Sequence, residues 1–208
     1  MRTIKIWLLG LLAAVLGFGD ELARVYMKNR LPYPVPRGGA EQYILGRLID
    51  IIEGFPPVDL QTGANDGDWV NLKNAAAVAV VFVSGIGTNC PGPPLTIEQA
   101  APNAGGGPSK ALNFTVIHRK QAATSLAGTT QWTRTTQTAS NTYTQTDAAE
   151  QDALWVVEFL PEDLDVANGF DHIRATVADV GGAAQPGYLY YIVVPKYPTT
   201  PATTLSYL

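Results

Sequence analysis

The chain has 208 residues, which suits one domain with appendages, and 15% of them are charged, against roughly 25% in an ordinary soluble domain. Much of the surface must therefore be uncharged or covered by neighbours. The net charge is -4, and the acidic excess lies after residue 50, where seven Lys/Arg stand against fourteen Asp/Glu, which argues against nucleic-acid binding by the body. The single Cys90 excludes an intrachain disulfide and a cysteine-based zinc site.

Residues 1–30 form an apolar leader. Arg2 and Lys5 precede an uncharged run from Ile6 to Gly19, a pattern typical of a signal peptide. The run is shorter than the about 20 residues of a membrane-spanning helix. Three other interpretations stay open: a helical or extended structural arm that docks on a neighbouring subunit, a membrane anchor, and a translation start at Met27.

Residues 31–55 are predicted to be a linker followed by a short amphipathic segment. The prolines of RLPYPVPRGG favour an extended backbone. In the next stretch, AEQYILGRLIDIIEG, apolar residues recur at helical spacing until Gly54. We interpret this stretch as either a helix or an edge strand.

Residues 56–196 are predicted to be all-β, because runs of β-branched and aromatic residues recur between turn residues. We expect an antiparallel two-sheet sandwich with jelly-roll-like connections, followed by an extended tail at 197–208. The stretch AAAVAVVFV is apolar at every position, which predicts a central strand buried on both faces. Strands are expected at 68–72, 76–84, 95–100, 111–119, 131–136, 142–146, 154–159, 172–179 and 187–194.

Two acidic stretches raise the question of a calcium site. In VDLQTGANDGDWVNLKN the oxygens do not follow the register of an EF-hand loop, and Asp66-Gly67 predicts a hairpin turn. In the stretch PEDLDVANGFD, Pro161 favours a short helical turn and Asn168-Gly169 a further turn. Its carboxylates are weak candidates for calcium ligands: Asp163, Asp165 and Asp171.

The sequence offers no catalytic constellation, and we expect neither an enzyme nor a cofactor. The histidines are His118 and His172, and no serine lies in a G-x-S-x-G motif. Asp171 and His172 are adjacent, which predicts side chains on opposite sides of a strand and no hydrogen bond between them.

The Thr-rich tract TSLAGTTQWTRTTQTASNTYTQT has two interpretations. β-branched threonine suits exposed strands, and this explains the tract without a function. Alternatively, Trp132 and Tyr143 form an outward interaction surface that stacks on sugars or pairs with a neighbouring subunit.

Several segments resemble small structural proteins of tailed bacteriophages. They are GFPPVDLQTGANDGDWVNLKN, LTIEQA, KALNFTVIHRKQAA, NTYTQTDAAEQDALWVVEFLPEDLDVANGFDHIRATVADVG and YIVVPKYP. The resemblance covers roughly residues 51–198 and implies a β-rich head component that decorates or cements the capsid lattice. The leader and the proline-rich linker depart from that pattern.

These observations favour a non-enzymatic virion protein located in the phage head. Its expected partners are the major capsid protein or other virion subunits, together with further copies of itself in a homo-oligomer. The alternative is a secreted or membrane-anchored glycan-binding sandwich that uses Trp132, Tyr143 and calcium-binding loops.

Overall fold

The computed structural model describes residues 48–87, 93–101, 107–122, 125–129, 131–144, 152–180 and 184–197. The expectations for the leader and for Cys90 therefore lie outside the described residues. The chain divides into two units, Met1–Ile44 and Leu45–Leu208, and the description below concerns the second unit.

The long strands alternate between buried and half-buried side chains, as the period of two in a strand requires. Every second side chain is buried in β10 (Asp152–Phe159), in β12 (Pro186–Pro195) and, from Val78 onward, in β4 (Ala75–Ser84). The buried set includes Phe82 and Trp155, both fully inaccessible to solvent. These side chains form one wall of the core.

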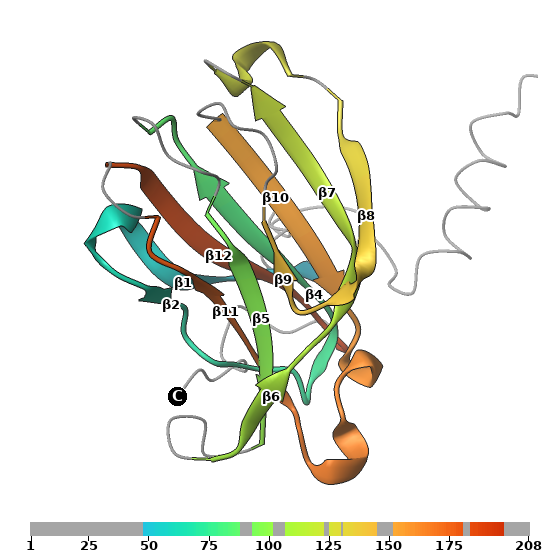
Figure 1. Ribbon diagram of the computed structural model, residues 1–208. Helices are drawn as coiled ribbons and strands as arrows, with labels where there is room; N and C mark the ends of the chain where they lie inside the picture. Colours follow the sequence, from blue (N-terminus) through green and yellow to red (C-terminus); the bar gives the residue numbers. More distant parts are fainter. Residues whose placement is uncertain are drawn as a thin grey trace, which may run out of the picture. The chain divides into compact units, whose positions relative to one another are not determined.

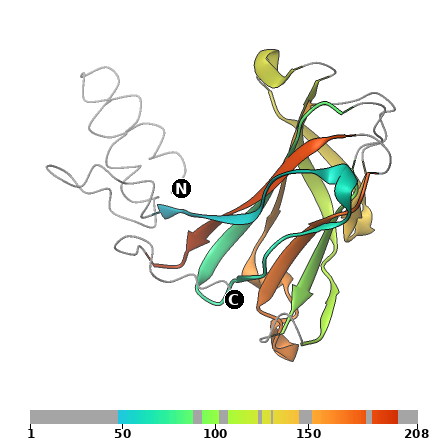
Figure 2. The same cartoon turned by 90° about the vertical axis from the view of Figure 1, so that its left-hand side faces the viewer.

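The first sheet, here called the β4 sheet, has the strand order β1-β12-β4-β10-β7-β8 (Figure 1). Its other strands are β1 (Asp50–Asp59) and β8 (Thr133–Ser140) at the two edges and β7 (Phe114–Ala122) beside β8. All of its pairings are antiparallel. Figure 2 shows β1 and β12, in blue and orange-red, running side by side along one border.

The second sheet, here called the β5 sheet, has the order β2-β11-β5-β6, and β3 and β9 pair with β11 and β5. It is also antiparallel. Its strands are β2 (Asn65–Asp66), β3 (Val70–Asn71), β5 (Leu95–Ala100), β6 (Ser109–Ala111), β9 (Thr142–Tyr143) and β11 (His172–Val177). Short 3-10 turns occur at Leu60–Thr62, Leu126–Gly128, Pro161–Asp163 and Val166–Asn168.

The chain crosses repeatedly from one sheet to the other, which is the connectivity of a jelly roll. β1 is followed by β2 and β3 in the opposite sheet, β4 returns, and β10, β11 and β12 alternate in the same way. The β7–β8 hairpin extends the β4 sheet beyond β10. The predicted all-β antiparallel sandwich is confirmed.

Aromatic side chains fill the space between the sheets. The Trp155 ring lies 5.4 Å from the Phe82 ring and 4.9 Å from the Tyr143 ring, measured between centroids. Edge-to-face contacts of this kind contribute about 1 kcal/mol beyond the area they bury. Tyr143 is 7% exposed, so the prediction that it belongs to an outward surface is wrong. Its partner across the strands, Leu95, is also buried, which places both on the inner side of the β5 sheet.

The segment with two interpretations, helix or edge strand, is an edge strand from Asp50 onward. β1 pairs with β12 through two irregularities, one on each side of Phe55. The bulges accommodate Gly54 and the two following prolines, which suit an edge strand because proline cannot donate to a ladder. The sandwich thus begins at Asp50, before the expected boundary at 56.

The predicted hairpin turn at Asp66-Gly67 is wrong. β2 and β3 instead lie one after the other along the same border of β11. Between them the Gly67 N–H donates to the Ala175 carbonyl at 2.9 Å, and a Cβ at Gly67 would lie 2.6 Å from that oxygen. Gly67 is needed for close approach and not for positive φ. Positive φ occurs at Gly169 (82°), where a turn is confirmed.

Candidate interaction surface

The outer side of the β4 sheet carries mostly apolar side chains, although its strands are already paired. β4 is central, as predicted, but its outward residues are half-buried, so burial on both faces is wrong. Their neighbours on β10 and β12 are half-buried as well. We call this surface the apolar face, and its residues are Ile51, Ala79, Val81, Val83, Val116, Leu154, Val156, Tyr188, Tyr190 and Ile192.

The strand registers align this surface into rows. In the middle row Tyr190 lies opposite Val81, which lies opposite Val156. Tyr188 and Tyr190 stand on the same side of β12 with ring centroids 5.6 Å apart. Ile51, on β1, is 59% exposed. Contiguous apolar surface of this kind marks an interaction site in a soluble protein.

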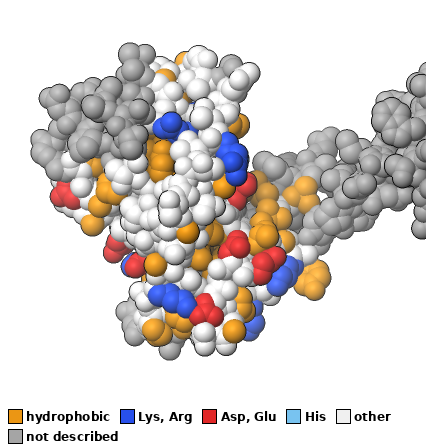
Figure 3. Space-filling model, turned by 45° about the vertical axis from the view of Figure 1, so that its right-hand side comes forward, with side chains coloured by type: hydrophobic (Ala, Val, Ile, Leu, Met, Phe, Trp, Pro, Cys, Tyr) orange, Lys and Arg blue, Asp and Glu red, His pale blue; other side chains and the backbone are white. Residues whose placement is uncertain are grey.

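Charged residues border the apolar face, and one more, the exposed Glu158 on β10, lies within it. Glu53 on β1 pairs with Tyr190, and Arg134 on β8 pairs with His118 at the opposite border. Both charged side chains are exposed. Figure 3 brings the β8 side forward and shows small groups of apolar side chains with acidic and basic side chains between them.

The outer side of the β5 sheet, here called the polar face, has a different character. The Arg174 guanidinium donates to Glu98 Oε2 through Nη2 at 2.6 Å and Nε at 3.2 Å. It also lies 3.6 Å from Asp66 Oδ2 and 4.6 Å above the Trp69 ring. Thr96 and Thr142 join their hydroxyls at 2.9 Å. These groups form bonds within the chain.

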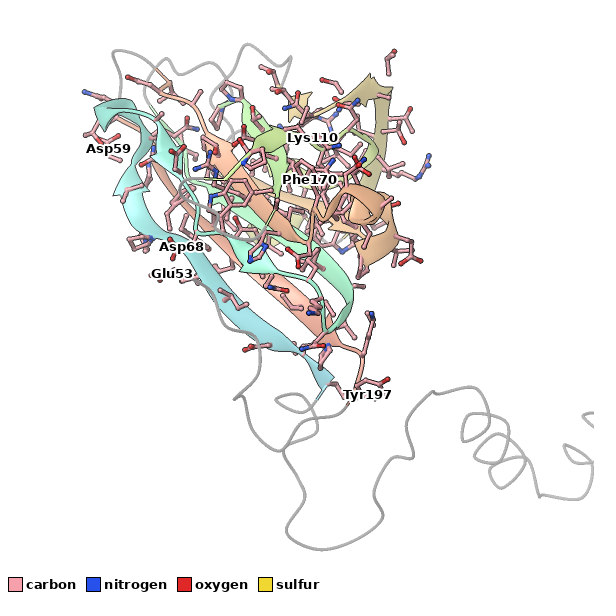
Figure 4. The ribbon with its side chains drawn as sticks, turned by 90° about the horizontal axis from the view of Figure 1, so that it is seen from below. Glu53, Asp59, Asp68, Lys110, Phe170 and Tyr197 are labelled. Carbon is pink, nitrogen blue, oxygen red and sulfur yellow. The ribbon has the colours of Figure 1, made fainter. Side chains whose placement is uncertain are left out.

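The calcium candidates lie in the turns after β10, and each carboxylate has its own partners. Asp163 Oδ2 accepts from the Leu160 N–H at 2.7 Å. Asp165 accepts from Asn168 and from Lys110, whose ammonium also lies 4.3 Å from the Phe170 ring (Figure 4). The Lys110 hydrogen bond is the main cause that lowers the pKa of Asp165. Among the described residues no three His, Cys, Asp or Glu gather closely enough to hold a metal ion.

Asp171 and His172 are hydrogen-bonded, contrary to the sequence prediction. Asp171 Oδ1 lies 2.6 Å from His172 Nδ1, and Asn71 Nδ2 lies 3.3 Å from His172 Nε2. β11 begins at His172, so Asp171 stands outside the strand and its alternation does not apply. His172 is 2% exposed, and its two ring nitrogens connect β3 to the turn before β11. This arrangement is structural.

Trp132 remains on the surface as predicted, with 47% of its area exposed. The Lys120 ammonium lies 4.9 Å from its ring, a cation–π contact that ties β7 to the start of β8. With Tyr143 in the core, the pair of aromatics expected to stack on a sugar does not exist. The apolar face was missed because its residues alternate with core residues of the same chemical type.

The described part of the chain contains no helix long and apolar enough to cross a membrane.

Comparison with known proteins finds a structural likeness to a phage-derived protein. No protein-family model matches the chain, and no curated protein matches it. Among solved structures, the SPBc2 prophage-derived protein YomS is 14% identical, and the alignment covers 70% of this chain and 92% of that chain. The TM-score is 0.39, too low for this likeness to carry a function to the present chain.

Proposed function

We propose that the chain is a non-enzymatic structural subunit of a bacteriophage particle. In this role it packs on the head as a capsid decoration or minor head protein, with the major capsid protein, other virion subunits or further copies of itself as partners. The observation that carries the proposal is the apolar face, an outer sheet surface that is dominated by Val, Ile, Leu and Tyr and bordered by charge. The sequence resemblance to phage head components supports the same role.

The physical logic is that of a subunit that stabilises an assembly by burying area. Burying apolar surface of this kind contributes about 25 cal/mol of favourable free energy for each Å² removed from water. On a symmetric particle the same contact is repeated many times, so a modest energy for each copy is sufficient. The polar face, in contrast, already satisfies its charges within the chain and has less to gain from a partner.

The burial of Tyr143 removes one of the two aromatic side chains on which the glycan-binding alternative depended. Stacking on a sugar requires an accessible aromatic face, and Tyr143 lies against Trp155 in the core. Trp132 is left with Lys120 over its ring. We therefore propose no second function.

Purified phage particles test the proposal. Mass spectrometry of particles should detect the chain in many copies. Particles produced without the gene should release DNA at a lower temperature, and added protein should restore their stability. A Val83→Asp variant should fail to restore it, whereas Lys73→Glu, in the turn before β4, should succeed. Absence of the chain from particles overturns the proposal.

A further inference from the structure

The registers of the β4 sheet define rows that run across all six strands. One complete row is Glu53, Tyr190, Val81, Val156, His118 and Arg134, in the order β1-β12-β4-β10-β7-β8. The next row is Ile51, Ile192, Ala79, Glu158, Val116 and Thr136. Its pairs are Ile51↔Ile192, Ile192↔Ala79, Ala79↔Glu158 and Val116↔Thr136. The complete row has an apolar centre, whereas the second row carries Glu158 next to Ala79 at its centre.

The complete row is polarised. Its β1 end is acidic at Glu53, and its β8 end is basic at Arg134, with His118 beside it. Four strands lie between the two ends. With strands about 4.8 Å apart, Glu53 and Arg134 are separated by roughly 24 Å and cannot pair within one chain. Figure 4 shows Glu53 at the β1 border, close to Asp68.

We propose that the apolar face binds a second copy of this chain through a two-fold axis that lies in the interface and runs along the strands between β4 and β10. This rotation keeps each row at the same position along the strands and reverses the order of its residues across the strands. Glu53 of one copy then faces Arg134 of the other, and the same contact occurs a second time by symmetry. Val81 faces Val156 at the centre.

The distribution of charge selects this axis. A two-fold axis across the strands would place the acidic β1 border against itself and the basic β8 border against itself, which is unfavourable. The axis along the strands joins opposite signs at both borders. Glu158, which is exposed near the end of β10, falls opposite the small Ala79 of the other copy.

The size of the face also suits a pair of copies. Outward residues repeat about every 6.8 Å along a strand, so six strands and three rows cover on the order of 600 Å² of flat area. Side-chain relief increases the accessible area beyond this. A standard interface buries about 800 Å² on each partner, so the apolar face is of the required order. Face-to-face sheets with apolar contacts are the arrangement already used in the core.

A charge exchange between copies tests the inference in the full chain. Analytical ultracentrifugation should show a dimer. Glu53→Lys alone and Arg134→Glu alone should each weaken it about tenfold, because two attractive contacts become repulsive. An equimolar mixture of the two variants should associate like the unchanged chain, since every contact in the mixed dimer joins opposite charges. The double variant should recover as well.

Lys73→Glu makes the same charge change as Arg134→Glu but lies in the turn before β4, and it should leave association unchanged. A monomer at all concentrations, or an oligomer insensitive to both exchanges, overturns the inference. It rests on the proposed function in treating the apolar face as an interface, yet the two can fail separately. A dimer with the expected exchange pattern and no chain in particles would reject the virion role alone. A particle-bound chain that is monomeric in solution would reject the dimer alone.

Discussion

The two outer faces of the sandwich use the same backbone pattern and differ in what their side chains contact. On the polar face, Arg174, Glu98, Asp66 and Trp69 bind one another, and Thr96 pairs with Thr142. On the apolar face, Val81 and its neighbours have their strand partners beside them and remain half-buried. A sheet can therefore satisfy one face internally and leave the other for association.

The difference shows that a strand's position in the sheet and the burial of its two sides are separate properties. β4 is central in its sheet, yet its outward side chains are not covered as its inward ones are. Folding requires one buried side of each sheet, whereas the composition of the other side depends on whether it contacts solvent or a partner. Substitutions on the polar face should therefore change folding stability, and substitutions on the apolar face should change association.

The largest expected effect is at Gly67, whose N–H donates to the Ala175 carbonyl and which leaves no room for a side chain beside Tyr191. A Gly67→Ala substitution would place Cβ 2.6 Å from the Ala175 oxygen and 2.7 Å from the Tyr191 hydroxyl. We expect a loss of about 3 kcal/mol in the free energy of unfolding, measured by urea denaturation. Gly128→Ala is the control, because a Cβ there meets nothing within 4 Å and should change stability by less than about 0.5 kcal/mol.

Neighbouring valines of β4 separate folding from association. Val80 is fully buried and Val81 lies on the apolar face. Val80→Thr should cost about 2 kcal/mol of folding free energy because it buries a hydroxyl without a partner. Val81→Thr should cost less than about 0.5 kcal/mol and should weaken dimerisation instead. Equal destabilisation by both would show that the apolar face is part of the folding core.

A smaller effect is expected from the bonds of the polar face. Arg174→Ala removes the contacts with Glu98, Asp66 and Trp69 and should lower the free energy of unfolding by about 1 kcal/mol. The loss should shrink as salt concentration rises, because the side chains are partly exposed. The measurement is thermal unfolding at two salt concentrations. Dimerisation should stay unchanged, since this face is turned away from the β4 sheet.

The smallest effect concerns pH. The Lys110 ammonium lowers the pKa of Asp165 below its ordinary value of 3.8, so the carboxylate stabilises the fold above that value and loses its contribution as pH falls through the folded pKa. Between pH 5 and about 2, the free energy of unfolding should therefore fall more steeply with decreasing pH for the unchanged chain than for Lys110→Gln. Lys73→Gln should keep the original slope. Identical slopes for all three chains would contradict the role of the Lys110 bond.

Much of the fold could be predicted from the sequence, because strand formation depends on local patterns. The segment 95–100 was predicted with its observed bounds, and 76–84 differs from β4 by one residue. Pro161 begins the short helical turn that its fixed φ favours. Gly169 adopts the left-handed conformation expected of an Asn-Gly turn. In each case the residue's own backbone preference is sufficient.

The predictions that failed depend on contacts between distant segments. Asp66-Gly67 has the composition of a hairpin turn, but β11 and Tyr191 make it a close-packed interruption in an edge strand. Tyr143 lies in a Thr-rich segment with the composition of an exposed strand, but its pairing with Leu95 turns its side chain onto Trp155. The apolar face was missed for the same reason, because a run such as AAAVAVVFV is apolar on both sides and does not indicate which side faces the core.

By itself, the sequence determined that this chain forms antiparallel strands and a sandwich, because β-branched and aromatic runs between turn residues have few other stable solutions. Tertiary structure alone decided which side of each strand meets the core and which residues share a row. Those properties depend on register, and register is set by pairing between segments far apart in the chain.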